Sequence, residues 1–314
     1  MLDFAVQGIQ MLLVLTMAPL LVGFTRLLKA RLLRRRGPPL LQPYRDLLRL
    51  MRKEVVLAEN ASWLFRAAPY VIFAATWVVA ALVPTFATGL MFSWTADLIA
   101  ITALLGTARF MLALAAMDVG TSFGGIGASR EMMFASLAEP AMMMIVFSVA
   151  LLAGSTQLSA VALYIQMHVT LRVTLGLALV GLIIVAVAET GRVPVDNPAT
   201  HLELTMVHEA MVLEYSGRHL AVIELAAALK LLVYISLIAC IFAPWGLAQE
   251  GAGPASFVVG ALSYVGKLAV GGALLVVFET AQAKMRVFRV PNFIGAALML
   301  ALLGTLLLFV SKGF

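Results

Sequence analysis

The chain has 314 residues, of which 62% are hydrophobic and only 12% are charged, and its mean hydropathy is +1.02. Soluble globular proteins carry roughly 25% charged residues, so this composition excludes a cytosolic enzyme and indicates an integral membrane protein. The single cysteine, Cys240, excludes a disulfide framework and any thiolate-held zinc or iron–sulfur site built by this chain alone. The net charge of +6 does not indicate a nucleic-acid partner, because the basic residues lie mainly in loops beside apolar stretches.

Eight apolar stretches are long enough to cross a bilayer as helices. A crossing needs about 20 apolar residues, and a helix satisfies its own backbone hydrogen bonds where lipid offers none. The sequence therefore predicts an all-α protein with one membrane domain, residues 1–314. The expected spans are 4–28, 67–88, 95–117, 132–153, 171–188, 219–243, 256–280 and 290–311.

The basic residues fall almost entirely on one face of this arrangement. Of the 22 Lys and Arg residues, 16 lie in the loops of one face, five lie within spans, and the other face has only Lys312. By the positive-inside rule the basic face is cytoplasmic, and an even number of spans then places both termini outside. Two long loops, 29–66 and 189–218, are cytoplasmic in this topology.

The first cytoplasmic loop, 29–66, contains ten basic residues and a predicted interfacial helix over 41–54. Leu47, Leu48 and Met51 are expected on one face of this helix, with arginines on another. Attraction to anionic lipid explains much of the charge. The alternative is a docking surface for a soluble subunit, and composition does not separate the two. The candidate docking residues are Arg34, Arg35, Arg36, Gln42, Pro43, Arg45, Asp46, Arg49, Arg52, Lys53 and Glu54.

The second cytoplasmic loop, 189–218, contains five acidic residues against two arginines. Its pattern E-T-x-R-x-P-x-D, followed by E-Y-S-G, resembles the signature loop of the membrane subunit that joins the two arms of respiratory complex I, and of its relatives in membrane-bound [NiFe] hydrogenases. The G-P, L-Q-P and K-E elements of the first loop agree, and so does the S-L-A-E sequence ending at Glu139. The signature residues are Glu189, Thr190, Arg192, Pro194, Asp196, Tyr215, Ser216 and Gly217.

Within that family the stretch 193–220 is similar to the membrane subunit of formate hydrogenlyase and hydrogenase-4 complexes. The first loop is also shorter than in the quinone-reducing relatives. The resemblance implies a prokaryotic inner-membrane subunit without a cofactor of its own and without catalytic residues. The expected partners are the soluble large and small hydrogenase subunits, which carry the nickel–iron centre, an iron–sulfur subunit, and antiporter-like membrane subunits.

Ionisable residues within or beside the spans gather in the predicted cytoplasmic half. A charge at the bilayer centre costs roughly 2.5–3.5 kcal/mol on insertion scales, so we expect these groups to face the bundle interior, paired or hydrated. They predict a proton path, although some of them are expected to be structural ion pairs. The candidates are Arg109, Glu139, Glu189, Glu203, Glu209, Glu214, Glu224, Lys230, Lys267 and Glu279.

Two other functions remain open at this point. The first is a quinone-site subunit of a complex I-like oxidoreductase. The second is a stand-alone secondary transporter; such a transporter is expected to have internal repeats, which the sequence does not show. His201 and His208 form a weak candidate metal pair, so no metal site is expected. The glycines of 120–127 lack the strand and helix of a nucleotide fingerprint and predict a loop at the membrane edge.

Overall fold

The computed structural model describes residues 2–89, 91–168, 172–196, 206–248, 253–283, 285 and 287–312, and within these it consists of helices and connecting loops. The predicted path residue Glu203 and the histidine His201 lie outside the described residues. The helices are α1 Leu2–Leu32, α2 Gln42–Met51, α3 Trp63–Leu82, α4 Leu98–Asp118, α5 Ser122–Ala153, α6 Leu158–Met167, α7 Val173–Glu189, α8 His208–Val212, α9 Gly217–Phe242, α10 Pro254–Ala281, the 3-10 turn η1 Val287–Arg289 and α11 Val290–Lys312.

The prediction of an all-α, multi-pass membrane protein is confirmed. Seven helices of the described part, α1, α3, α4, α5, α9, α10 and α11, are long and apolar enough to cross a membrane. The predicted span 171–188 corresponds to α7, which has 17 described residues and counts only as a shorter apolar helix. The placement of the termini and of the loops relative to the two sides of the membrane stays a prediction.

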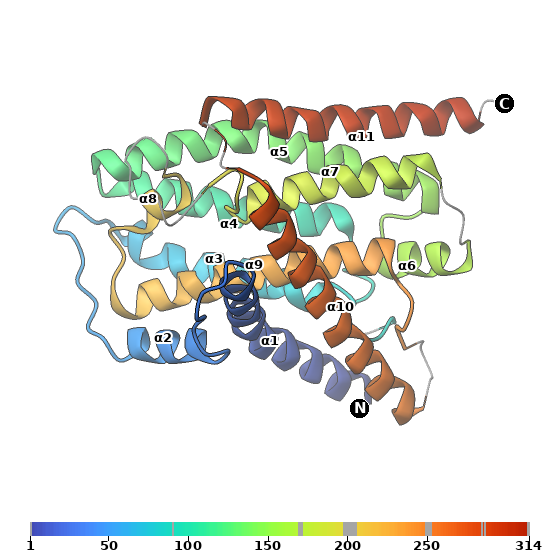
Figure 1. Cartoon of the computed structure of the whole chain (residues 1–314), viewed down its shortest axis with the longest axis horizontal. Coiled ribbons are helices and arrows are strands. Elements are labelled where there is room, and N and C mark those ends of the chain that lie inside the picture. Colours follow the sequence, from blue (N-terminus) through green and yellow to red (C-terminus); the bar gives the residue numbers. More distant parts are fainter. Residues whose placement is uncertain are drawn as a thin grey trace.

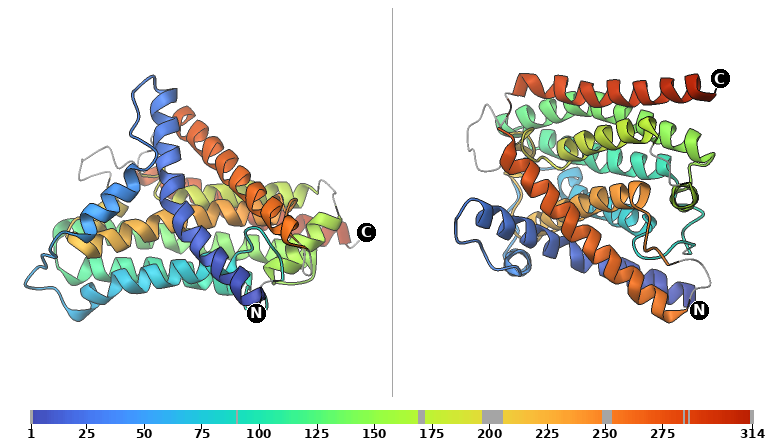
Figure 2. Two further views of the ribbon diagram at one scale, coloured as in Figure 1. Left: turned by 90° about the horizontal axis from the view of Figure 1, so that it is seen from below. Right: turned by 45° about the vertical axis from the view of Figure 1, so that its right-hand side comes forward.

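The helices form a bundle of near-parallel elements crossed by two oblique ones. Helices α3, α4, α5, α7, α9 and α11 run in a similar direction, while α1 and α10 cross them at a steep angle (Figures 1 and 2). Helix α4 packs between α3 and α5, α11 covers α5 and α7, and α1 packs on both α9 and α10. The first long loop, α2 and the described parts of the second long loop gather at one end of the bundle (Figure 1).

The glycine-rich segment 120–127 is not a loop, which corrects the sequence prediction. The Thr121 hydroxyl accepts a hydrogen bond from Gly124 N, caps α5 and starts this helix ten residues before the predicted span. A Cβ atom on Gly124 would collide with Ala116 O, and one on Gly127 would lie 2.9 Å from Val207 O. The glycines therefore allow close helix packing and close approach of the second long loop.

Candidate functional site

A buried guanidinium group lies at the centre of an ion network built by three helices. The side chain of Arg109 on α4 is 4% exposed, and it forms ion pairs with Glu131 and Glu139 of α5 and with Glu189 at the end of α7. Its Nε lies 3.3 Å from Glu131 Oε1, and its Nη1 lies 3.8 Å from Glu139 Oε1. A guanidinium group presents several donors in a fixed plane, so it can hold carboxylates from several directions.

Helix α9 adds a second cation to this network. Lys230 Nζ lies 2.9 Å from Glu189 Oε2, so Glu189 connects the two cations, and its own side chain is only 6% exposed. Three carboxylates then face two cations, so the fully ionised network carries one surplus negative charge. Closely spaced groups of this kind share protons as a unit. The network of Arg109, Glu131, Glu139, Glu189 and Lys230 is therefore suited to take up and release one proton.

A second ion cluster joins α1, α10 and the second long loop. The carboxylate of Glu279 is 2% exposed and lies 2.7 Å from Lys29 Nζ and 3.0 Å from Arg192 Nη1. The two cations are partly exposed, with 38% and 23% of their side chains accessible. Glu279 therefore holds the oblique helix pair and the signature loop together at the edge of a cavity.

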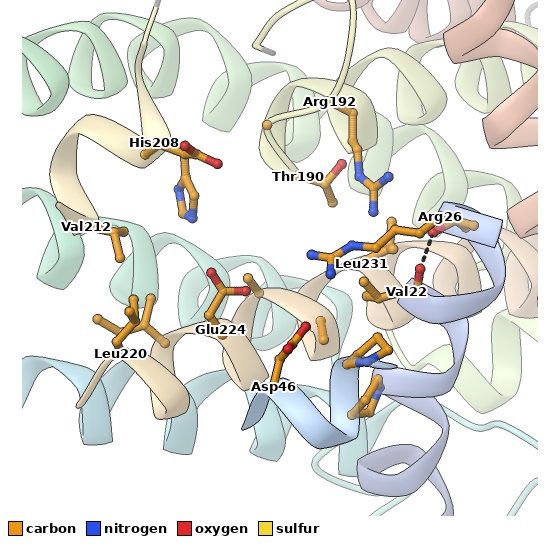
Figure 3. Close-up of a pocket in the computed structure, with 18 of the residues that line it drawn as sticks. Val22, Arg26, Asp46, Thr190, Arg192, His208, Val212, Leu220, Glu224 and Leu231 are labelled. Carbon is orange, nitrogen blue, oxygen red and sulfur yellow. Dashed lines mark hydrogen bonds between the residues drawn. The ribbon is translucent and has the colours of Figure 1, made fainter. Parts of the chain in front are cut away.

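This cavity has a volume of about 700 Å³ and lies where α1, α2, α9 and the second loop meet. In Figure 3 the side chains of Glu224, His208 and Arg192 point toward its interior from different elements. The ionisable residues that line it are Arg26, Lys29, Asp46, Arg49, Arg192, Asp196, His208, Glu209, Tyr215, Glu224 and Glu279. The cavity is thus lined by many ionisable side chains and, on the side of α1 and α9, also by apolar residues.

His208 lies between the cavity and the ion network. Burial lowers the pKa of His208 below its ordinary value, and the negative charges of Glu131, Asp196 and Glu224 partly oppose that shift. The positive charge of Lys230 acts in the same direction as burial. His208 is therefore influenced by charged groups of both the cavity and the ion network. Its imidazole is neutral near neutral pH, and a neutral imidazole can both accept and donate a proton.

The signature loop is fixed by hydrogen bonds within itself and to α5. Asp196 Oδ2 accepts hydrogen bonds from Val207 N and His208 N, and so joins the end of the signature motif to the start of α8. Arg130 on α5 donates to Met206 O at 2.9 Å. These contacts place His208 over the network.

The E-Y-S-G element connects the second loop to the first. The Tyr215 ring stacks on Phe65 with centroids 3.9 Å apart, and its hydroxyl donates to Phe65 O. Burial raises the pKa of Tyr215, which keeps this hydroxyl protonated. The Ser216 hydroxyl accepts from Val56 N and donates to Val56 O, both at 2.8 Å. Tyr215 and Ser216 therefore have structural roles beside the cavity.

Gly217 is required for this loop connection. It has φ +54°, and a Cβ atom there would lie 2.5 Å from Glu54 O. We expect Gly217→Ala to lower the free energy of unfolding by about 1–3 kcal/mol, because it adds both a backbone strain and a clash. Thermal unfolding in detergent measures this, with Gly8→Ala as the control, since nothing lies within 4 Å of a Cβ atom at Gly8. Equal effects of the two variants would contradict the assigned role.

The candidate docking residues divide into an inward and an outward group. Helix α2 forms within the predicted range 41–54, and its residues Pro43, Asp46 and Arg49 line the cavity. Of the three apolar residues predicted on one face of this helix, Leu47 lines the cavity, while Leu48 and Met51 are 59% and 50% exposed, and their place against lipid stays a prediction. The outward group consists of Arg34, Arg35, Arg36, Arg45, Arg52, Lys53 and Glu54, all of which are exposed.

The predicted path residues are only partly brought together. The network contains Arg109, Glu139, Glu189 and Lys230, while Glu209, Glu224 and Glu279 line the cavity. Glu139 differs from the expectation of an inward-facing group: its side chain is 51% exposed, and its Oε1 would lie 3.5 Å from a Cβ atom on Gly106. Glu214 is partly buried beside Tyr215, and Lys267 on α10 is partly buried away from the network.

Sequence reasoning missed Glu131 and Lys29. Glu131 was excluded because the predicted span began one residue later, although it lies about two helical turns before Glu139 on the same helix. Lys29 was assigned to the first loop, but α1 continues to Leu32. Among the residues that the structure describes, no group of three or more His, Cys, Asp or Glu side chains is arranged to hold a metal ion.

Comparison with known proteins identifies one family and several relatives of this chain. The model of the family described as NADH dehydrogenase matches residues 5–310. The chain is 33% identical over 296 residues to formate hydrogenlyase subunit 4 of Escherichia coli, covering 94% of this chain and 95% of that protein. It is 35% identical over 241 residues to hydrogenase-4 component C of the same organism, covering 77% and 76% of the two chains.

More distant similarity reaches a respiratory enzyme and a solved structure. NADH-quinone oxidoreductase subunit 8 of Rhodothermus marinus is 30% identical over 211 residues, which cover 64% of this chain and 60% of that protein. The fold is shared with a chain of the membrane-bound sulfane sulfur reductase, an archaeal respiratory membrane complex, with a TM-score of 0.82 and 19% identity over 98% and 99% of the two chains. The chain therefore belongs to the NADH dehydrogenase family of membrane proteins.

Proposed function

We propose that this chain is the membrane-anchoring and proton-coupling subunit of a membrane-bound [NiFe] hydrogenase complex of the formate hydrogenlyase type. The observation that carries the proton-coupling part is the ion network around Arg109, which lies beside a polar cavity and includes a partly exposed carboxylate, Glu139. The similarity to the two Escherichia coli hydrogenase subunits supports the choice of complex.

The path begins at the cavity and ends at the side of the bundle. A proton enters at Glu224, passes to His208, and reaches Glu131 and Lys230, whose charges act on the His208 ring. Glu189 and Arg109 lead on to Glu139. A guanidinium group is not deprotonated in proteins, so Arg109 moves no proton itself and instead holds Glu131, Glu139 and Glu189 close to one another. The exposed position of Glu139 allows transfer into a neighbouring membrane subunit.

The soluble partners dock on the end of the bundle that contains the two long loops. The outward-facing basic residues of the first loop supply a positively charged surface beside the cavity. The nickel–iron centre and the iron–sulfur clusters belong to the large and small hydrogenase subunits and an iron–sulfur subunit, and antiporter-like subunits receive the proton. Such a complex resides in the inner membrane of a prokaryote, with the loops on the cytoplasmic side.

The cavity itself favours a second candidate, a quinone-site subunit of a complex I-like oxidoreductase. Its volume of about 700 Å³ falls in the range of small-molecule sites, and its walls combine apolar residues with a few polar groups. In this function the headgroup of a quinone occupies the space between α1, α2 and α9. The match to NADH-quinone oxidoreductase subunit 8 supports the quinone-site function, but it covers less of the chain than the match to the formate hydrogenlyase subunit, which supports the hydrogenase function.

Purification of the intact complex from native membranes distinguishes the two functions. The hydrogenase function predicts that subunits with nickel and iron–sulfur clusters copurify with the chain, and that the complex evolves hydrogen without added quinone. Bound quinone together with turnover that requires quinone would contradict it and support the second candidate. Recovery of the chain without any soluble subunit under mild detergent conditions would contradict both.

A further inference from the structure

Lys267 is an intramembrane cation without a counter-charge in the described part of the chain. It lies in the middle of α10, about 20 Å along the helix axis from either end. No ion pair of the described residues includes it, and it lies near the buried, uncharged thiol of Cys240 on α9. Its side chain is partly exposed at the surface of the bundle. A charge in this position costs several kcal/mol unless it is paired or neutralised.

Helix α10 is poorly covered by the rest of the chain. Only 22% of its most apolar stretch is buried, compared with 61% for α9, and it packs on α1 and α9 alone among the larger helix contacts. Figures 1 and 2 show it as an oblique helix on the outside of the bundle. On the side of Lys267 the exposed residues of α10 are apolar or small: Val270 and Leu274 are 60% and 65% exposed, and Gly266 has open space around a Cβ position. Small residues allow another helix to approach closely.

The depth of Lys267 in the membrane limits which kinds of anion can contact its ammonium group. A lysine side chain spans only a part of the distance from the helix centre to either headgroup layer, since half the hydrocarbon core is about 15 Å thick. A lipid phosphate therefore lies out of reach. An anion at this depth must come from a membrane-embedded side chain, and a carboxylate on a neighbouring helix supplies it.

We propose that the exposed face of α10 around Lys267 binds a transmembrane helix of a partner subunit, and that this helix places an Asp or Glu carboxylate against the Lys267 ammonium group. Apolar packing over Gly266 and Leu274 brings the two helices together, and the ion pair fixes their depth and rotation. The proposal rests on the proposed function only in requiring that the chain is a subunit of a membrane complex.

Photo-crosslinking in the intact complex tests the surface. A benzoylphenylalanine at Val270, which is 60% exposed and one turn from Lys267, is activated in native membranes, and the joined peptide is sequenced. We expect an apolar segment of a copurifying subunit that contains Asp or Glu within about one helical turn of the attachment point. Adducts with lipid alone, or a segment without an acidic residue, would overturn the proposal.

Substitution of the pair tests the carboxylate. Lys267→Met and neutralisation of the partner carboxylate should each reduce retention of the partner after a detergent wash by about tenfold, and the double variant should lose no more than either single variant. Lys267→Arg should retain the partner, and Val270→Met serves as the matched control on the same face. Full retention in Lys267→Met overturns the proposal, whereas a parent complex that contains no partner subunit overturns the proposed function instead.

Discussion

Replacement of Arg109 by Met should have the largest effect on the stability of this protein. The variant leaves Glu131, Glu139 and Glu189 without their common cation and removes a side chain that is only 4% exposed. Breaking a buried ion pair by removing one partner typically costs 3–5 kcal/mol, because the remaining charge stays buried and uncompensated. We expect the free energy of unfolding to fall by about this amount, which thermal unfolding of the detergent-solubilised complex measures.

Two further variants make this result specific. Arg172→Met removes an exposed arginine at the N-terminus of α7 and should leave the unfolding temperature nearly unchanged. Adding Glu131→Gln to Arg109→Met removes one of the unpaired carboxylates and should restore part of the lost stability. An unfolding temperature of Arg109→Met equal to that of Arg172→Met would show that the carboxylates are not held by Arg109.

Replacement of Glu279 by Gln should have the second largest effect. Its carboxylate is 2% exposed and pairs with both Lys29 and Arg192, so the neutral variant leaves two cations facing each other across the cavity edge. Because both cations are partly exposed and water screens them, we expect a loss of about 2–4 kcal/mol rather than the full cost of a buried pair. The signature loop should also loosen where Arg192 held it.

Hydrogen exchange locates this second effect. Amide protons of residues 187–196 should exchange faster in Glu279→Gln than in the parent chain, while those of α4 and α5 should be unchanged. Glu59→Gln, at an exposed position of the first loop, is the matched control and should change neither region. Unchanged exchange in 187–196 would mean that Glu279 does not hold the loop.

The membrane helices were predictable because their signal is local. Each span is a long apolar run that is bounded by charged residues or by residues typical of turns. Pro254, for example, marks the start of α10. The start of α5 was not predictable in this way. From sequence alone, its glycines are compatible with a loop. The structure shows that the helix requires small residues there, because it packs closely against Ala116 and Val207.

The ion network was predictable in its members but not in its pairing. Depth along a span places a charge near the bilayer centre, whereas its partner depends on the rotation of each helix about its own axis. Arg109 and Glu189 were expected to be paired or hydrated, and the structure shows that they pair with each other. Lys267 lies at the middle of its helix, as Lys230 does, but on the outer side of α10, so depth alone grouped it with the wrong neighbours.

The central claim is that protons pass from the cavity through the network to Glu139. The most direct test compares Glu139→Gln and Glu224→Gln with Glu59→Gln in the assembled complex, and measures hydrogen turnover and proton uptake in the same vesicles. We expect both path variants to lower proton uptake at least tenfold, with a smaller loss of hydrogen turnover, and Glu59→Gln to match the parent. Unchanged proton uptake in both path variants, with the complex fully assembled, would contradict the claim.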